Sequence, residues 1–188
     1  RKNKDYDLVI NVPPASSKST IVTVLFPVYC WAIDPTLKIL TGSYAQSLSL
    51  EHAVKSRTVI NSPRFKELYP EIVLKDDANN KSSYDNTLKG NRTATSVGSG
   101  VIGRHYHAIL IDDPIIATAT DLEIKNANDW INVSLSTRKI NKEITPTILV
   151  MQRIHQNDPS ALMTKRDTVK HINLPAELTV DTTKDFIP

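Results

Sequence analysis

Residues 11–20 have the sequence NVPPASSKST and end in a lysine and two hydroxyl residues that could bind a nucleotide. In loops of the form G-x-x-x-x-G-K-[ST], the lysine reaches the β- and γ-phosphates and the following hydroxyl binds Mg²⁺. Val12 and Ser17 stand at the two glycine positions here. The segment therefore indicates either a phosphate-binding loop without its glycines or an ordinary strand-to-helix turn. In the first interpretation the nucleotide-binding residues are Ser16, Ser17, Lys18, Ser19 and Thr20.

An acidic pair follows another apolar run, in the segment HAILIDDP at residues 107–114. At the carboxyl end of a buried strand in a nucleotide-binding sheet, one acid binds Mg²⁺ and another orients or deprotonates the attacking water. Asp112, together with Ser19, is therefore the predicted metal ligand, and Asp113 is the predicted catalytic residue. The alternative is a strand that merely ends in an Asp-Asp-Pro turn, but the earlier Lys18 favours the functional interpretation.

The segment GSGVIGRHYH at residues 98–107 holds three of the chain's five glycines and one arginine, Arg104. A guanidinium stabilises the charge that develops on a γ-phosphate, so Arg104 is a candidate catalytic residue, with a solvated arginine as the alternative. His105 and His107 could share one face of this segment. They have no further ligands nearby in the sequence, so a metal site there is not favoured.

A third candidate catalytic residue, Gln152, follows the strand predicted at residues 145–151. In most nucleotide-binding sheets such a strand lies beside the acid-bearing strand, and its terminal polar residue senses the γ-phosphate. The alternative is a strand that simply leaves the core.

The elements that must position these residues alternate between short apolar strands and amphipathic helices. Strands are predicted at residues 7–12, 37–42, 107–112, 145–151 and 169–175, and helices at 18–33, 44–62 and 121–139. Residues 82–97 alternate about Lys89-Gly90-Asn91, as in a hairpin. Pro27 should kink the first helix, and Asp121 should cap the third. The core-facing residues expected in the second helix are Leu48, Val54 and Ile60. This order predicts an α/β fold, with a mainly parallel central sheet flanked by helices and an inserted β-hairpin.

The chain has 188 residues, a formal net charge of +3, a pI near 8.9 and one cysteine, Cys30. These values suit one domain without an internal disulfide, in a reducing compartment, and they are compatible with nucleic-acid contact without being diagnostic of it. The longest apolar stretch, residues 21–33, is shorter than the roughly 20 residues of a membrane span. We therefore expect a soluble, intracellular domain of a longer protein.

Taken in order, these segments resemble the ATPase domain of the large terminase subunit of tailed bacteriophages, the DNA-packaging motor. That family has a strand followed by Pro-Pro and a phosphate loop, a TGSYA-like second strand, Gly-Arg ahead of Asp-Asp-Pro, a strand followed by Arg-x-His and an acid, and a closing Leu-Pro-Ala. The matching segments here are INVPPASSKS, LKILTGSYAQSLS, GSGVIGRHYHAILIDDP, ILVMQRIHQND and INLPAEL. No single segment is specific, but their order and spacing are, and they cover nearly the whole chain.

The resemblance implies a P-loop NTPase fold of the ASCE/RecA-like class, with ATP and Mg²⁺ as cofactors. It gives the candidate residues their roles: phosphate and Mg²⁺ binding by Lys18, Ser19 and Asp112, catalysis by Asp113, action on a neighbouring subunit's ATP by Arg104, and coupling by Gln152. The implied partners are double-stranded DNA, the small terminase subunit and a homo-oligomeric ring, a pentamer, docked on the portal of a procapsid. The implied location is the host cytoplasm, transiently at the procapsid portal, with no membrane contact.

The resemblance also implies a domain organisation. Residues 1–178 would form the ATPase domain, and residues 179–188 would begin a linker toward a nuclease domain that this sequence does not include. Nuclease activity is therefore not expected of this chain alone.

Two departures from the family pattern keep other functions open. Ala15 stands where many members have an arginine, and Ser17 replaces the glycine before the lysine. The alternatives are a degenerate, non-hydrolysing nucleotide-binding or ring-scaffold module and a helicase-like DNA-dependent ATPase. Because glycine adopts positive φ without strain, Ser17 predicts either a strained phosphate cradle or a loop that relaxes when empty. Pro13-Pro14 stiffen the entry to the loop and favour the relaxed form.

Overall fold

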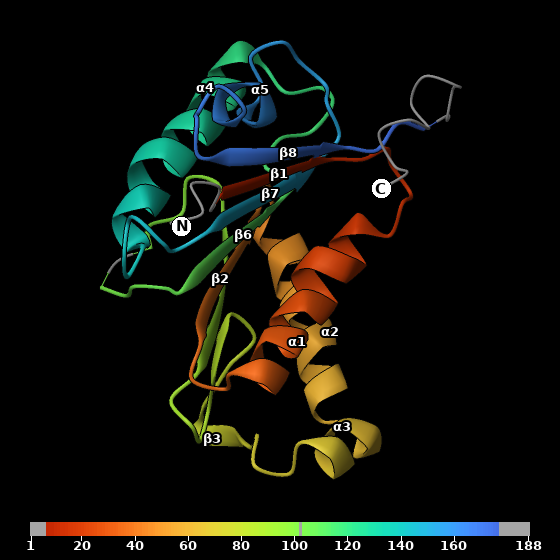
Figure 1. Ribbon diagram of the computed structural model, residues 1–188, viewed down its shortest axis with the longest axis vertical. Helices are drawn as coiled ribbons and strands as arrows, with labels where there is room; N and C mark the ends of the chain where they lie inside the picture. Colours follow the sequence, from red (N-terminus) through yellow and green to blue (C-terminus); the bar gives the residue numbers. More distant parts are fainter. Residues whose placement is uncertain (1–6, 102, 177–188) are drawn as a thin grey trace.

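The central element is a sheet of eight strands in the order β3-β4-β5-β2-β6-β7-β1-β8 (Figure 1), in a computed structural model that describes residues 7–101 and 103–176. The strands are β1 (Asp7–Asn11), β2 (Lys38–Ser43), β3 (Leu74–Asn79), β4 (Ser83–Asn86), β5 (Asn91–Ser96), β6 (Ala108–Asp112), β7 (Thr147–Met151) and β8 (Val169–Asn173). Neighbouring strands from β5 to β8 in this order are parallel, whereas β3-β4 and β4-β5 are antiparallel. The mainly parallel sheet and the β4-β5 hairpin confirm the predicted α/β class.

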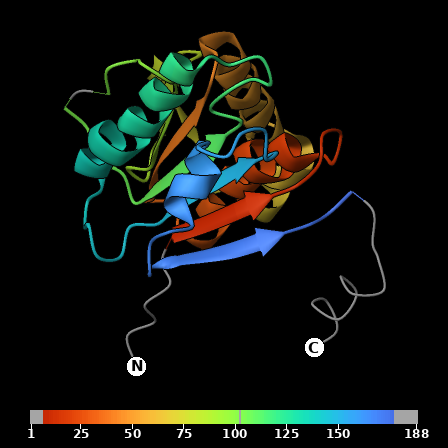
Figure 2. The same ribbon diagram turned by 90° about the horizontal axis from the view of Figure 1, so that it is seen from above.

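Two hydrophobic cores lie on the two faces of this sheet. In β6, Ile109 and Ile111 pack with residues of α4 (Asp121–Asp129), whereas Leu110 packs on the opposite face with residues of α1 (Phe26–Ile33) and α2 (Gln46–Ile60). Successive side chains of a strand point to opposite faces, so a strand covered on both faces must be apolar throughout. Figures 1 and 2 show α1 and α2 on one side of the sheet and α4 and α5 (Pro159–Met163) on the other.

The helix after β1 begins with a π-helical segment, Thr20–Leu25, and continues as α1. Pro27 has no N–H to donate, so a regular helix would leave the carbonyl of Thr23 without its partner. Arg92 Nη2 donates a hydrogen bond to that carbonyl over 2.6 Å, and Ser56 Oγ donates one to the carbonyl of Val24 over 2.6 Å. The kink predicted at Pro27 therefore takes the form of a π-helical segment whose free carbonyls accept side-chain hydrogen bonds.

The cap of α4 is Thr120 and not Asp121, which is the first residue of the helix. The side chain of Thr120 accepts from the Glu123 N–H over 3.3 Å, and the Glu123 carboxylate accepts from the Thr120 N–H over 2.7 Å. This reciprocal pair satisfies two N–H groups, whereas Asp121 as the cap would satisfy one. The predicted helix over residues 121–139 continues as the π-helical segment Trp130–Leu135 and the 3₁₀ turn Ser136–Arg138.

The buried face of α2 is more polar than the sequence predicts. Of the expected core residues, Ile60 is buried, but Leu48 and Val54 are only partly buried. The buried residues are Ser49, His52, Ala53, Ser56 and Ile60. Polar side chains occupy this face because they form hydrogen bonds with the preceding helix and with β5, as Ser56 does with Val24 and Ser49 with the Thr95 carbonyl.

The sequence does not predict three short elements, α3 (Pro63–Leu68), β3 and α5. The predicted boundary at residue 179 lies outside the described residues. Across residues 7–101 and 103–176, no helix has both the length and the apolar character that crossing a membrane requires.

Candidate nucleotide-binding site

Parallel strands bring most of the candidate residues to one edge of the sheet. β7 lies between β1 and β6, and Asn11 pairs with Met151 while Asp112 pairs with Val150. β2 lies on the other side of β6, with Ser43 beside Asp112. Ligands of open parallel sheets bind outside the carboxyl ends of the strands, where the loop after β1 and the acids at the end of β6 meet. The predicted pairing of the strand at 145–151 with the acid-bearing strand is confirmed.

The loop after β1 contains two residues other than glycine with positive φ, Ala15 at 60° and Ser17 at 58°. Ser16, between them, does not have positive φ, so the sign of φ alternates along the loop. Alternation of this kind turns successive N–H groups toward a common point and forms an anion-binding concavity. Ser17 thus has the left-handed backbone that glycine would adopt without strain. This corresponds to the strained form of the loop and not to the relaxed form favoured from the sequence.

Lys18 and Asp113, two of the predicted functional residues, form an ion pair. Lys18 Nζ lies 3.0 Å from Asp113 Oδ2, and the two side chains are 10% and 26% exposed. The other carboxylate oxygen of Asp113 accepts a hydrogen bond from the N–H of Gln152 over 3.3 Å. An anion that bound Lys18 would compete with this ion pair and would release the Asp113 carboxylate for other chemistry.

Asp112 is completely buried, and within the described part of the chain neither of its carboxylate oxygens has a hydrogen-bond partner. Burial raises the pKa of Asp112 to about 6; nearby Asp113 also raises it, whereas Ser19 and Lys18 oppose the rise. A buried carboxylate without partners is costly, and a cation would compensate it. The carboxylate oxygens and the adjacent Ser19 hydroxyl are ligands that suit Mg²⁺.

No group of three or more His, Cys, Asp or Glu residues that could hold a metal occurs among residues 7–101 and 103–176. Mg²⁺ binds through one or two protein carboxylates together with waters and substrate phosphates.

His52 on α2 is a buried residue of this site that the sequence analysis missed. Its Nδ1 lies 3.0 Å from Thr23 Oγ1 and 3.7 Å from Asp112 Oδ2. Thr23 Oγ1 donates to the Ser19 carbonyl over 2.6 Å, so it accepts from His52, whose proton is therefore on Nδ1. Burial, and then the charge of Arg92, lower the pKa of His52. The neutral imidazole thus links the helix of the phosphate loop to the acid.

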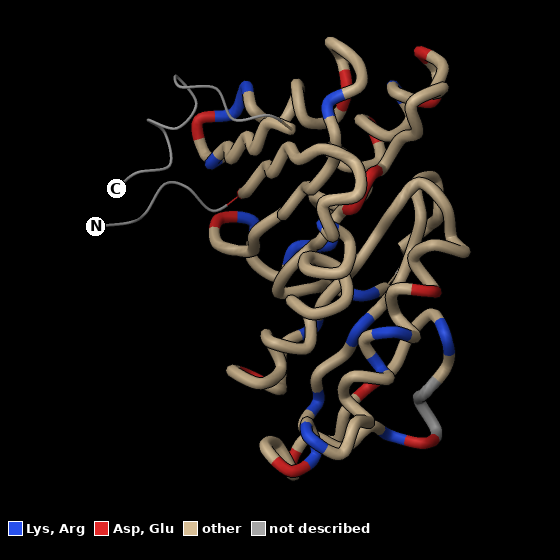
Figure 3. Tube along the Cα trace, turned by 90° about the vertical axis from the view of Figure 1, so that its right-hand side faces the viewer, with Lys and Arg blue, Asp and Glu red and all other residues tan. Residues whose placement is uncertain are grey.

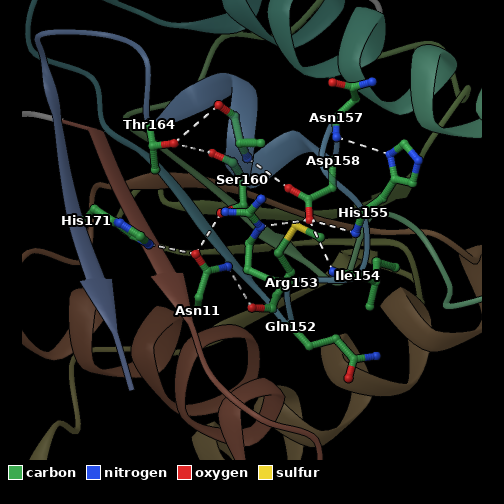
Figure 4. Close-up of polar contacts among 12 residues, drawn as sticks. Asn11, Gln152, Arg153, Ile154, His155, Asn157, Asp158, Ser160, Thr164 and His171 are labelled. Carbon is green, nitrogen blue, oxygen red and sulfur yellow. Dashed lines mark hydrogen bonds and ion pairs between the residues drawn. The ribbon is translucent and has the colours of Figure 1, made fainter. Parts of the chain in front are cut away.

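Gln152 begins the turn after β7, and the carboxylate of Asp158 holds that turn in place. Asp158 Oδ2 accepts hydrogen bonds from Arg153 Nε over 3.0 Å, from the Ile154 N–H over 3.2 Å and from the His155 N–H over 3.3 Å. The other carboxylate oxygen of Asp158 caps α5. Figure 4 shows the side chain of Gln152 pointing away from this network. Arg153, His155 and Asp158 therefore stabilise the turn that contains Gln152.

Arg104 lies at the opposite, amino-terminal edge of the sheet. It precedes β6, and its Nη1 donates a hydrogen bond to Ser83 Oγ over 2.8 Å. Because β6 is about 13 Å long, Arg104 is remote from the acids at the far end of that strand. His107, in the same segment, accepts a hydrogen bond at Nδ1 from the Lys38 N–H over 2.9 Å, so this nitrogen is engaged with the backbone.

The sequence matches no known protein family and no curated protein. Among solved structures, the chain is similar to the N-terminal domain of the DNA packaging ATPase from bacteriophage phi29, with a TM-score of 0.52 and 14% identity over 95% of this chain and 93% of that one. The chain therefore shares the fold of that domain. The large terminase from a thermophilic bacteriophage, in complex with ADP, is also similar, with a TM-score of 0.48 and 11% identity. That similarity covers 97% of this chain and 44% of the terminase, so this chain spans less than half of that protein.

Within this fold, the structure brings together the loop after β1, Asp112, Asp113 and the turn that carries Gln152. Arg104 stays apart from them. The sequence found the residues that follow strand ends, and it missed His52, which reaches the site from the middle of a helix.

Proposed function

We propose that this chain is the ATPase domain of a phage DNA-packaging motor that couples ATP hydrolysis to translocation of double-stranded DNA into a procapsid. The observation that carries the proposal is the convergence of Lys18, Asp112 and Asp113 at one edge of the sheet, with Lys18 Nζ 3.0 Å from Asp113 Oδ2. The similarity in fold to the phi29 packaging ATPase domain supports this type of motor. In the proposed motor the chains form a homo-oligomeric ring on the procapsid portal, together with a small terminase subunit, in the host cytoplasm.

The residues of the site divide the work of hydrolysis. Lys18 leaves Asp113 and binds the β- and γ-phosphates, while the N–H groups of the loop bind their oxygens. The released Asp113 carboxylate accepts the proton of the attacking water or orients that water. Ser19 and Asp112 would hold Mg²⁺, which when bound supplies positive charge to the phosphate oxygens. His52 Nδ1 lies 3.7 Å from Asp112 Oδ2, so the imidazole borders the metal-binding carboxylate without a hydrogen bond to it.

Gln152 acts beside the site, whereas Arg104 is remote from it. The N–H of Gln152 already contacts Asp113, so a change at the γ-phosphate would reach the turn after β7 through that carboxylate. Arg104 lies at the other edge of the sheet, so the finger role given to it by the resemblance requires the nucleotide of a neighbouring subunit.

A non-hydrolysing nucleotide-binding module is the second candidate, and the loop itself favours it. Ala15 supplies no charge where many terminases have an arginine, and the strain at Ser17 weakens the loop as a phosphate cradle. Such a module would bind Mg·ATP without turning it over.

Nucleotide binding tests both candidates at their shared step. We expect Lys18→Ala to weaken the affinity for a fluorescent ATP analogue by about tenfold or more, because a hydrogen bond to a charged group is worth about 1.5–3 kcal/mol. Lys125→Ala, an exposed lysine on α4, is the matched control and should bind as the wild type does. Equal affinity in Lys18→Ala and the wild type would show that residues 11–20 are not a phosphate loop.

A further inference from the structure

A groove of about 470 Å³ lies at the amino-terminal edge of the sheet, opposite to the nucleotide site. Four separate segments supply its cations: Lys38 begins β2, Lys75 lies in β3, Lys89 lies in the β4-β5 turn, and Arg104 precedes β6. We call the groove that these four cations line the basic groove. The hairpin predicted from the sequence therefore contributes to a surface as well as to the sheet.

The basic groove concentrates positive charge. Its four cations face one carboxylate, that of Asp85, whereas the whole chain has a net charge of +3. None of the four cations forms an ion pair with another residue that the structure describes. Lys38, Lys89 and Arg104 are exposed, and Lys75 is partly exposed. Figure 3 shows Lys and Arg positions in the lower half of the view, with some Asp and Glu positions among them. Cations left unpaired in one groove indicate an anionic partner.

We propose that the basic groove binds the phosphate backbone of duplex DNA. In taking DNA as the source of the phosphates, the inference rests on the proposed function. Duplex DNA carries one charge per about 1.7 Å of its axis, so a row of cations on separate segments meets several phosphates at once. A triphosphate is held instead by converging N–H groups, as in the loop after β1. The three lysines of the groove therefore favour a polyanion over a single nucleotide.

The lining of the groove also separates duplex from single-stranded DNA. Proteins that bind single strands present aromatic side chains on which bases stack. Among the residues that line the groove, Tyr106 is the one Phe, Tyr or Trp, and it is 1% exposed, whereas His105 is exposed. Contacts are thus confined to phosphates, which carry no sequence information, so the groove binds duplexes of different sequence equally well.

The position of the groove connects it to the nucleotide site. β2 begins in the groove at Lys38 and ends at Ser43, which pairs with Asp112. A strand of this length spans roughly 16 Å. One layer of parallel strands therefore has the DNA groove at one end and the ATP site at the other.

Salt-dependent binding of a fluorescent duplex of about 30 base pairs, long enough to cover several phosphate contacts, tests the proposal. Each of the variants Lys38→Gln, Lys75→Gln, Lys89→Gln and Arg104→Gln should weaken binding and lower the slope of log affinity against log salt by about 1, since each removes about one phosphate contact. Lys125→Gln, on α4, should leave the affinity and the slope unchanged. Slopes equal to that of the wild type, or an equal loss in Lys125→Gln, would overturn the proposal.

Two further arms identify the source of the phosphates. The lysine variants Lys38→Gln, Lys75→Gln and Lys89→Gln should bind the fluorescent ATP analogue as tightly as the wild type does. If they lost ATP affinity and kept duplex affinity, the groove would be a nucleotide site and the proposal would be wrong. Tighter binding of a single strand than of the duplex would also overturn it. A wild type that binds duplex through the groove but binds no ATP analogue would contradict the proposed function alone.

Discussion

Asp112 and Asp113 are neighbours in the sequence but lie in opposite environments. Asp112 is completely buried without hydrogen-bond partners among the described residues, whereas Asp113 is 26% exposed and paired with Lys18. A buried carboxylate without hydrogen-bond partners is stabilised when it binds a cation. An accessible carboxylate can exchange its partner for water or accept a proton. This difference assigns Asp112 to metal binding and Asp113 to catalysis in the proposed function.

Replacing Asp112 by asparagine should stabilise the nucleotide-free fold at high pH. Since burial raises the folded-state pKa of Asp112 to about 6, the folded chain keeps a proton that the unfolded chain releases near pH 4. The carboxylate therefore costs nothing below about pH 4 and costs up to about 3 kcal/mol above about pH 6. We expect urea unfolding in EDTA to show Asp112→Asn more stable than the wild type by about 1–3 kcal/mol at pH 8, with a gap that closes toward pH 4.

Asp113→Asn is the matched control for this prediction. It loses the ion pair with Lys18 and should show no stabilisation at pH 8. A stability gap for Asp112→Asn that is independent of pH would contradict the assignment of a costly buried carboxylate at that position.

The site residues predicted from the sequence share a feature that a sequence can reveal. Lys18, Asp112 and Gln152 each lie at or next to the end of an apolar run, so the run itself predicts where they emerge. His52 and Arg92 do not follow an apolar run, and their partners are distant in the chain, so the sequence does not mark them as site residues. His52 contacts Thr23, 29 residues away, and Arg92 contacts the Thr23 carbonyl, 69 residues away. Such contacts arise only when helix and sheet pack together.

At the level of elements, the phosphate loop contains two strained positions, Ala15 and Ser17. Ser17 has a φ of 58°, and a residue other than glycine in this region costs about 1–3 kcal/mol. Ser17→Gly relieves that strain but adds about 0.4–1 kcal/mol of unfolded-chain entropy. We expect a net gain of about 1 kcal/mol in the free energy of unfolding, and tighter binding of the fluorescent ATP analogue.

Ser16→Gly separates strain relief from a general effect of glycine. Ser16 does not have positive φ, so this variant adds flexibility without relieving strain and should be destabilising. Equal destabilisation by Ser16→Gly and Ser17→Gly would show that the loop is not strained at Ser17.

The parallel strands were predictable because buried β-branched and aliphatic runs are short and end at prolines, acids or glycine. β3 and α5 could not be predicted, because their sequences, LKDDAN and PSALM, are too short or too polar to show a strand or helix periodicity. The face of α2 was mispredicted because Leu48 and Val54 suggested an apolar stripe, while Ser49, His52 and Ser56 are the residues buried. Polar residues can occupy a helix interface when they find hydrogen-bond partners there, as Ser56 does with the Val24 carbonyl and Ser49 with the Thr95 carbonyl.

At the scale of the whole molecule, the sheet separates the two surfaces proposed to bind phosphates. The candidate ATP site lies at the carboxyl ends of β1, β6 and β7, and the basic groove lies at the amino-terminal ends of β2, β5 and β6. This arrangement suits a motor in which one surface hydrolyses nucleotide and the other holds DNA. An arginine finger supplied by a neighbour is worth about 10³ to 10⁵ in rate, so an isolated chain should turn over ATP slowly and an assembled ring faster.

ATP turnover by Asp113→Asn, measured beside its affinity for the fluorescent ATP analogue with Mg²⁺, tests the central claim most directly. Asparagine cannot act as a base but leaves Lys18, Ser19 and Asp112 in place, so binding should persist while turnover falls by about 10²-fold or more. Asp112→Asn should instead lose Mg²⁺-dependent binding as well as turnover. Turnover by Asp113→Asn within a few-fold of that of the wild type, with duplex DNA present, would contradict the account.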